Sequence, residues 1–183
     1  MPELLSVVIA EDNYLVREGT RRLLEDSGRV EVLAGVGTAV ELLDAVTRLR
    51  PRAVLTDIRM PPGHQTEGIE AAHAIRKSYP DVGVVVLSQH SDAAYAVQLF
   101  RDGTDGLGYL LKASVGDLDD LVHALHEVAA GRSVVDARVV ERLVDFRARQ
   151  TQSAVRALSA RELAVLREMA EGKRNGAIAE SRH

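Results

Sequence analysis

Side chains that could carry out chemistry stand directly after the short apolar runs of this sequence. They comprise three carboxylates, a hydroxyl and an ammonium group: Glu11, Asp12, Asp57, Ser88 and Lys112. Taken alone, each has an ordinary structural explanation, because acidic residues favour helix N-termini and Asp and Ser are common in turns. Five such residues at the same end of successive runs instead indicate a functional site.

The residue types indicate what that site would do. In an open parallel sheet, ligands bind beyond the carboxyl ends of the strands, so these residues would meet at one edge. Three crowded carboxylates repel one another and need a cation, and Mg²⁺ prefers oxygen ligands and often binds phosphate as well. With Mg²⁺ and Lys112 supplying positive charge, the Asp57 carboxylate could attack a phosphoryl group and form an acyl phosphate. Ser88 could then donate a hydrogen bond to a phosphoryl oxygen.

The elements that position these residues follow from the hydrophobic pattern. Five short runs predict strands at 5–10, 30–36, 53–56, 82–87 and 108–111. Apolar residues recur at helical spacing between the runs, as in the stripe of Leu15, Leu23 and Leu24. This alternation predicts right-handed βαβ units, and hence an α/β domain with a parallel sheet covered by helices on both faces.

Composition excludes several other classes of protein. The chain has 183 residues, of which 46% are hydrophobic and 3% aromatic, so its core must be aliphatic. It contains no cysteine, which excludes disulfide scaffolds, cysteine-ligated zinc and thiol catalysis. The N-terminal residues lack a basic leader, and no apolar run approaches the roughly 20 residues of a membrane span. We therefore expect a soluble cytoplasmic protein without a membrane partner.

Charge divides the chain into an acidic and a basic part. Residues 1–130 hold 12 Lys and Arg against 20 Asp and Glu, a net charge of −8. Residues 131–183 hold 11 against 7, a net charge of +4. This asymmetry indicates two modules, of which the second suits an anionic partner such as nucleic acid.

Helix-end signals predict where these modules begin and end. A helix over 117–130 stops at Gly131, and a further helix is expected over 136–149. Ser159 and Glu162 then form a capping box at another helix start. The predicted order is a first domain, a helical linker and a short helical C-terminal segment, over 1–131, 132–156 and 157–183.

Three alternative sites fail on their residue patterns. The G-x-G at 35–37 hints at a dinucleotide loop, but Val40 stands where the third glycine should be. His123 and His126 are three residues apart on a predicted helix, but no further metal ligand is apparent nearby and a solvated helix face explains them better. A phosphatase of the haloacid dehalogenase type would need a second Asp two residues after its nucleophile, where this chain has Arg59.

Four motifs at their spacings resemble the receiver domain of bacterial two-component response regulators over residues 4–130. They are EDN at 11–13, TDIRMP at 56–61, LSQH at 87–90 and GYLLK at 108–112. The RMPP, GYLLK and following AAGR resemble the branch with a LuxR-type or nitrate-response helix-turn-helix output. The resemblance implies a flavodoxin-like fold whose five parallel strands are ordered 2-1-3-4-5. It also implies a signalling phosphoacceptor, which catalyses only its own Mg²⁺-dependent phosphorylation and dephosphorylation.

The resemblance implies a role for each site residue. A sensor histidine kinase would donate the phosphoryl group to Asp57, with Lys112 and Ser88 assisting. Ser88 and Tyr109 would be the switch pair: the hydroxyl moves toward the phosphate and the ring turns inward. This change would reshape the surface of the fourth helix, fifth strand and fifth helix, through which we expect a homodimer to form. Mg²⁺ would be held by three carboxylates and one backbone carbonyl, those of Glu11, Asp12, Asp57 and Arg59.

Some positions depart from the usual receiver pattern. Gln89 stands where a small residue is frequent, which predicts tighter access to the phosphoryl group. Arg59 and His90 occupy positions that tune dephosphorylation in relatives, so the phosphoryl lifetime is left open. Ala113 follows Lys112 where many receivers have proline, which leaves a cis peptide at that bond open.

The C-terminal residues resemble the opening of the LuxR-type DNA-binding domain. The matching stretch is LSARELAVLREMAEGKRNGAIAE, and the recognition helix, which contacts bases in such domains, would come after it. Two alternatives stay open: the front part of a longer transcription factor, or a regulator that lost this output and signals through protein–protein contacts. We expect no DNA-binding residue within the 183 residues, and DNA binding only with a complete C-terminal domain.

Overall fold

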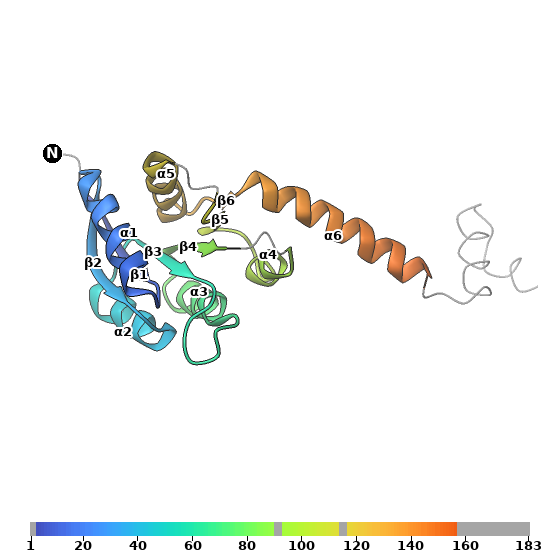
Figure 1. The fold of residues 1–183 in the computed structure, drawn as a ribbon, viewed down its shortest axis with the longest axis horizontal. Helices are drawn as coiled ribbons and strands as arrows, with labels where there is room; N and C mark the ends of the chain where they lie inside the picture. Colours follow the sequence, from blue (N-terminus) through green and yellow to red (C-terminus); the bar gives the residue numbers. More distant parts are fainter. Residues whose placement is uncertain (1–2, 90–92, 114–116, 157–183) are drawn as a thin grey trace, which may run out of the picture. The chain divides into compact units, whose positions relative to one another are not determined.

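The computed structural model describes residues 3–89, 93–113 and 117–156, with side chains placed up to residue 149. Strands and helices alternate along this part of the chain (Figure 1). The strands are β1 (Leu5–Ala10), β2 (Val30–Val36), β3 (Ala53–Asp57), β4 (Gly83–Ser88), β5 (Leu107–Leu111) and β6 (Val134–Val135). The helices are α1 (Tyr14–Asp26), α2 (Ala39–Leu49), α3 (Glu67–Ser78), α4 (Ala93–Leu99), α5 (Leu118–Ala129) and α6 (Ala137–Arg156). The alternation predicted from the sequence is confirmed.

The sheet is parallel, with strand order β2-β1-β3-β4-β5-β6. The first five strands have the order 2-1-3-4-5 that was expected, but a sixth strand corrects the predicted number. Val134 and Val135 pair with Gly108 and Tyr109, and the N–H of Asp136 donates to the carbonyl of Tyr109 over 2.9 Å. The sequence missed β6 because two residues are too few to show the alternation by which a strand is recognised.

Side chains alternate between the two faces of the sheet and form two cores. In β4, Val84 and Val86 enter the core beneath α2, α3 and α4, whereas Val85 enters the core beneath α1 and α5. All three valines are fully buried. Figure 1 shows α5 and α3 on opposite sides of the strands. Helices therefore cover both faces of the sheet, as predicted from strands that are apolar at consecutive positions.

Side-chain caps fix where the helices begin. The carboxamide oxygen of Asn13 accepts the N–H groups of Leu15 and Val16 at 3.0 and 3.2 Å, which starts α1 immediately after the acidic pair 11–12. Asp117 caps α5 in the same way, through the N–H of Asp119. Because backbone N–H groups of a first helical turn lack intrahelical partners, such caps stabilise the helix and fix its start.

The predicted apolar stripe of α1 is wrong for two of its three members. Leu24 is fully buried, but Leu15 and Leu23 are 78% and 58% exposed. Leu15 and Leu24 are nine positions apart, about two and a half helical turns, so they lie on opposite faces of the helix. Apolar side chains of α1 are therefore left on the surface.

The first compact unit of the chain extends past the predicted domain end at 131. The chain divides into two units, Met1–Leu143 and Val144–His183. β6 and the first turns of α6 belong to the first unit, and Val139 of α6 is fully buried in the core that contains Tyr109. The capping box expected at Ser159 and Glu162 lies outside the described residues.

Helix α6 runs over Ala137–Arg156, longer than the predicted helix over 136–149. Its 20 residues include five arginines, one glutamate and one aspartate. No helix in the described part of the chain is both long and apolar enough to span a membrane.

Candidate functional site

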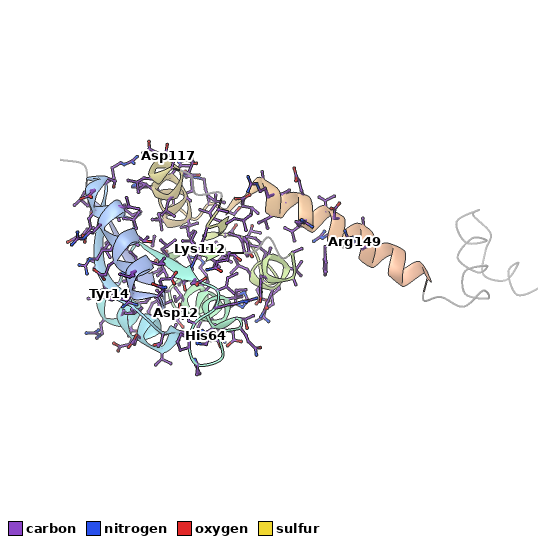
Figure 2. The ribbon with its side chains drawn as sticks, in the orientation of Figure 1. Asp12, Tyr14, His64, Lys112, Asp117 and Arg149 are labelled. Carbon is purple, nitrogen blue, oxygen red and sulfur yellow. The ribbon has the colours of Figure 1, made fainter. Side chains whose placement is uncertain are left out.

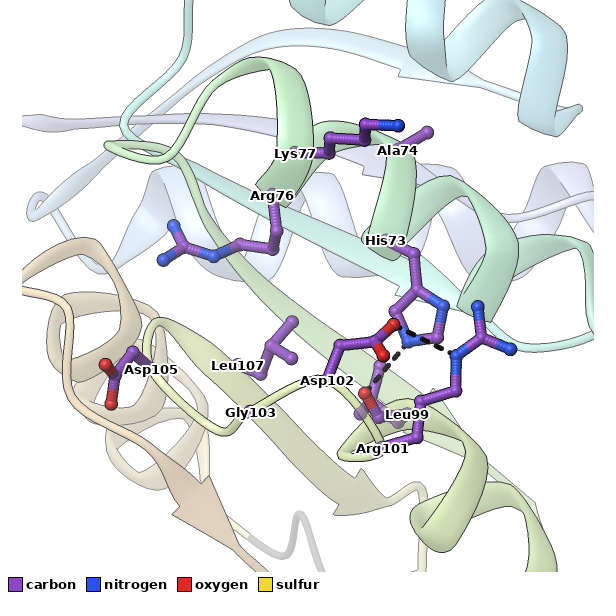
Figure 3. A pocket seen from close by; sticks show the side chains of 10 residues that line it. All are labelled: His73, Ala74, Arg76, Lys77, Leu99, Arg101, Asp102, Gly103, Asp105 and Leu107. Carbon is purple, nitrogen blue, oxygen red and sulfur yellow. Dashed lines mark hydrogen bonds and ion pairs between the residues drawn. The ribbon is translucent and has the colours of Figure 1, made fainter.

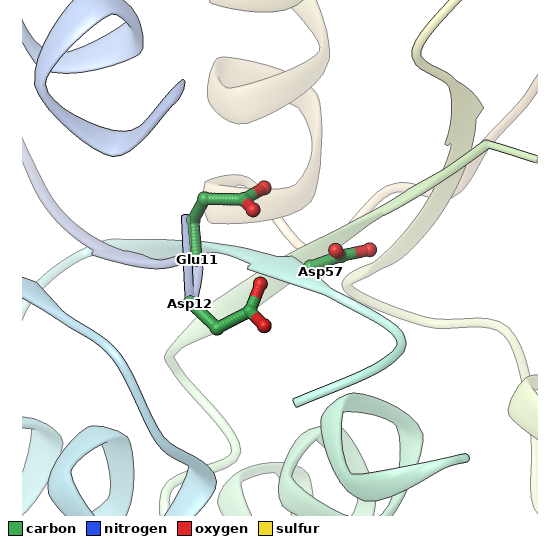
Figure 4. Close-up of side chains that lie close together, drawn as sticks. All are labelled: Glu11, Asp12 and Asp57. Atoms are coloured by element: carbon green, nitrogen blue, oxygen red, sulfur yellow. The ribbon is translucent and has the colours of Figure 1, made fainter. Parts of the chain in front are cut away.

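Three carboxylates meet beyond the carboxyl ends of two neighbouring strands. β1 ends at Ala10, so Glu11 and Asp12 follow it directly, and Asp57 is the last residue of β3. Because β1 pairs with β3, the three side chains come together: one oxygen of each lies within 4.8 Å of the others (Figure 4). Glu11 is buried, Asp57 partly buried and Asp12 exposed, so the cluster is open to solvent on one side.

Lys112 supplies a positive charge to this cluster. It follows β5, and its backbone N–H donates to the carbonyl of Ser88 over 2.7 Å, which fixes where the side chain starts. Its ammonium Nζ lies 2.7 Å from Glu11 Oε2 and 3.1 Å from Asp57 Oδ2. Figure 2 labels Lys112 and Asp12 in this region of the molecule. One cation therefore holds carboxylates from two strands.

The charge state of Lys112 follows from these contacts. Burial acts to lower the pKa of Lys112, but the hydrogen bonds and charges of Glu11 and Asp57 outweigh it and raise the pKa above its ordinary value. The side chain is therefore an ammonium cation at neutral pH. It offsets one of three negative charges, and the remaining excess is what a divalent cation would neutralise.

The donor set fits Mg²⁺. Glu11, Asp12 and Asp57 offer only oxygen ligands, and Mg²⁺ is usually bound by a few carboxylates together with waters and phosphate. Each of these carboxylates retains an oxygen close to the other two. Among the described residues, no other group of three His, Cys, Asp or Glu side chains is close enough to hold an ion. His123 and His126 accordingly belong to no such group.

A cavity of about 240 Å³ opens above the carboxylates. Its wall includes residues from four segments of the chain: Asp12, Asp57, Ile58, Arg59, His64, Ser88, Gln89 and Tyr95. Asp57 ends β3 and Ser88 ends the neighbouring strand β4, so the two side chains lie at the same edge of the sheet and both line the cavity. A cavity of this volume, lined by the carboxylate and the hydroxyl, has room for a small anion.

Two residues of this cavity were not found from the sequence. His64 Nδ1 lies 3.6 Å from Asp12 Oδ2, and Arg59 Nη2 donates a hydrogen bond to the Tyr95 hydroxyl over 2.9 Å. His64 is held with a positive φ of 52° and its N–H donates to the carbonyl of Met60. The sequence contained only a weak signal for His64, a histidine in a polar loop. It contained none for Tyr95, which reaches the cavity only because of how α4 packs.

The two expected switch residues are both buried. Ser88 is 3% exposed and Tyr109 is 0% exposed, with its ring in the core beneath α3 and α4. The resemblance implied a ring that turns inward, and here the ring is already inside. At Lys112–Ala113 the structure records no cis peptide; within the described residues the cis bond is Pro61–Pro62.

A larger cavity lies at the opposite end of the sheet. Its volume is about 620 Å³, and its wall includes His73, Arg76, Arg101 and Leu107, the first residue of β5 (Figure 3). Three of its polar side chains already have protein partners. Arg76 donates to the carbonyl of Val82, Arg101 pairs with Asp102, and His73 Nε2 contacts the carbonyl of Leu99. Size alone therefore does not make it the functional site.

Comparison with known proteins decides the family. Residues 7–126 match the model of the response regulator receiver domain. The chain belongs to the response regulator family. The transcriptional regulatory protein DegU of Brevibacillus brevis is 30% identical to this regulator over 194 residues, covering 97% of this chain and 79% of DegU.

Solved structures of response regulators share the fold. A LuxR-family two-component response regulator from Aurantimonas sp. SI85-9A1 is 27% identical, with a TM-score of 0.68 over 80% of this chain and 99% of that one. RcsB in a complex with DNA is 27% identical, with a TM-score of 0.64 over 98% of this chain and 83% of that one. This response regulator is thus related to LuxR-family transcription regulators.

Proposed function

We propose that Asp57 is the residue of this response regulator that accepts a phosphoryl group from a sensor histidine kinase. The observation that carries the proposal is the cluster of Glu11, Asp12 and Asp57 with Lys112 bound to two of them. A site with excess negative charge and one fixed cation suits a metal and an incoming phosphoryl group. Family membership supports the same assignment.

The residues divide the reaction between them. An Asp57 oxygen forms the new bond to phosphorus while the bond from phosphorus to the donor's histidine nitrogen breaks, and that nitrogen takes up a proton from solvent. Mg²⁺ bound by Glu11, Asp12 and Asp57 would supply charge neutralisation for the phosphoryl oxygens. Lys112 holds Asp57 in place and supplies a second positive charge, and Ser88 donates a hydrogen bond to the attached group.

An apolar groove beside Asp57 supports a protein as the phosphoryl donor. A cavity of about 380 Å³ contains Asp57 and Lys112 at its polar end. Its walls are apolar side chains of α1, α5 and β4, namely Val16, Leu23, Leu87, Leu118 and Leu121. Exposed Leu15 lies on the same helix α1. A helix of the kinase that covered these side chains would bring its phosphohistidine to Asp57.

The output is proposed from the relatives. RcsB is a response regulator solved in a complex with DNA, and DegU is a transcriptional regulatory protein. We assign residues 157–183 to the front part of a LuxR-type helix-turn-helix domain, the part of α6 beyond Leu143 to a helical linker, and the dimer contact to the surface of α4, β5 and α5. Phosphorylation of Asp57 then acts on transcription through dimerisation.

The mass of the intact chain tests the assignment. The full chain is incubated with acetyl phosphate and Mg²⁺ and its mass is followed over time. Wild type and Asp105→Asn, a control at an exposed aspartate, should gain one phosphoryl group, and Asp57→Asn should gain none. Removal of Mg²⁺ by a chelator should abolish the gain. Equal gain by Asp57→Asn and wild type would show that the assigned residue is wrong.

A further inference from the structure

Two side chains from different elements hold each other at the mouth of the cavity above Asp57. Arg59 lies two residues beyond the end of β3, and Tyr95 lies in the first turn of α4. Arg59 Nη2 donates to Tyr95 Oη over 2.9 Å, and the guanidinium carbon lies 5.7 Å from the centre of the tyrosine ring. Both side chains line the cavity that contains Asp57 and Ser88. The pair therefore links that cavity directly to α4.

The two partners differ in their freedom to move. Arg59 is exposed, so its guanidinium can turn toward other acceptors at the cavity mouth. The ring of Tyr95 is half-buried and packs against the core under α3 and α4, so it moves only with its helix. A break in this contact would release the first turn of α4 while the strand that carries Asp57 stays in place.

A phosphoryl group on Asp57 would compete with Tyr95 for the guanidinium. The tyrosine oxygen is a neutral acceptor of a single hydrogen bond from Arg59. A phosphoryl group offers several charged oxygens, and arginine binds such groups through shorter, stronger and often bidentate hydrogen bonds. Because Arg59 already lines the wall of the cavity, the competing acceptor would appear within its reach.

The burial of Tyr109 directs attention to a second link from the site to α4. Its ring has no exposed surface, so an inward turn of this ring is already complete in the structure. The contact between Arg59 and Tyr95 joins the same cavity to the same helix and is intact. It is therefore a contact that phosphorylation has yet to change.

We propose that Arg59 and Tyr95 form a latch on α4, which opens when Asp57 carries a phosphoryl group. Without that group, the hydrogen bond holds the first turn of α4 at the cavity mouth. With it, Arg59 donates to the phosphoryl oxygens and α4 is released. The exchange moves hydrogen bonds and changes no covalent bond. It rests on the proposed function, because it requires a phosphoryl group on Asp57.

The latch predicts a reciprocal effect on anion binding. If a phosphoryl group must break the hydrogen bond to Tyr95, then removing that bond beforehand tightens binding of the group by the same factor. For one hydrogen bond of ordinary net strength this factor is about fivefold. A variant that only damages the fold would weaken binding, so the direction of the effect separates the latch from a structural role.

The test uses the full chain and beryllofluoride with Mg²⁺ as a mimic of the attached phosphoryl group. Tyr95→Phe removes the hydroxyl and keeps the ring, and it should bind beryllofluoride about fivefold more tightly than wild type. Arg59→Met should bind it more weakly than wild type. Tyr79→Phe is the matched control, because Tyr79 donates to Thr47 Oγ1 over 3.1 Å and stacks with Arg50 at 4.2 Å, between α2 and α3. It should bind as wild type does.

Hydrogen exchange of the α4 peptide, residues 93–99, measures whether α4 is released when the latch opens. In wild type, beryllofluoride should speed this exchange about fivefold, and Tyr95→Phe should show the faster exchange without it. Unchanged or weaker binding by Tyr95→Phe, or tighter binding by Tyr79→Phe as well, overturns the latch. If wild type binds no beryllofluoride and gains no phosphoryl group, the proposed function itself is wrong and the latch falls with it.

Discussion

At the scale of single residues, Lys112 shows how the site tolerates its own charge. Its ammonium group binds buried Glu11 and partly buried Asp57, and these contacts keep it protonated. A buried ion pair does little for stability relative to an apolar pair, but removal of one partner leaves the other charge unpaired. The site is therefore stable only while some cation is present.

Replacement of this lysine should separate stability from metal binding. Lys112→Met leaves Glu11 and Asp57 unpaired, and in a chelator it should lower the free energy of unfolding by about 3 kcal/mol. Mg²⁺ should then stabilise this variant more than it stabilises wild type, because a ligand of the folded state adds stability according to its affinity. Urea unfolding with and without Mg²⁺ measures both effects. Lys77→Met, at an exposed lysine, should change neither, and a Lys112→Met as stable as wild type in chelator would contradict the assigned role.

At the scale of elements, the close contact between α3 and the end of β3 positions the phosphoacceptor. The N–H of Gly68 in the first turn of α3 donates to the carbonyl of Ile58 over 2.9 Å. A Cβ at this glycine would lie 1.8 Å from the backbone oxygen of Asp57. Only a residue without a side chain lets the helix begin this near to the strand.

Gly68→Ala should therefore disturb the site as well as the fold. The displaced backbone should cost at least about 2 kcal/mol of stability, and phosphorylation of Asp57 by acetyl phosphate should become slower. Gly19→Ala is the control: it lies in the exposed part of α1 with nothing within 4 Å of the added Cβ. It should stabilise the protein by about 0.5–1 kcal/mol, because alanine favours the helix. Normal phosphorylation of Gly68→Ala would refute the positioning role of this contact.

At the scale of the whole molecule, the chain beyond the predicted domain end at 131 completes the core of the first unit. β6 extends the sheet, and Val139 is buried in the same core as Tyr109. The next residue, Val140, is 45% exposed. The first unit, Met1–Leu143, therefore depends on residues that the sequence placed in a linker.

Two adjacent valines test this dependence. Val139→Ala should lower the free energy of unfolding by about 2 kcal/mol, because it removes buried methyl groups and leaves a cavity. Val140→Ala should have almost no effect, because its side chain is largely exposed. Chemical denaturation of both variants and of wild type measures these changes in the free energy of unfolding. Equal effects of the two substitutions would show that α6 does not pack on the first unit through Val139.

The positions of the carboxylates could be predicted, but other parts of the site could not. Glu11, Asp12 and Asp57 were found because residues after parallel strands always meet at one sheet edge, whatever the details of packing. Tyr95 was missed, since it reaches the cavity only because of how α4 packs on the core. Leu15 was wrongly assigned to the buried face of α1, because its angular position around the helix was not compared with that of Leu24. Strand β6 was missed because two residues are too few to show the alternation of side chains that identifies a strand.

The most direct test of the account identifies the residue that carries the phosphoryl group. The full chain is treated with acetyl phosphate and Mg²⁺ and then with borohydride, which reduces an acyl phosphate to an alcohol and leaves free carboxylates unchanged. Sequencing of the peptides by mass spectrometry then shows which aspartate has become homoserine. The account predicts conversion at Asp57, dependent on both donor and Mg²⁺. Conversion at another carboxylate, or at none, would contradict it.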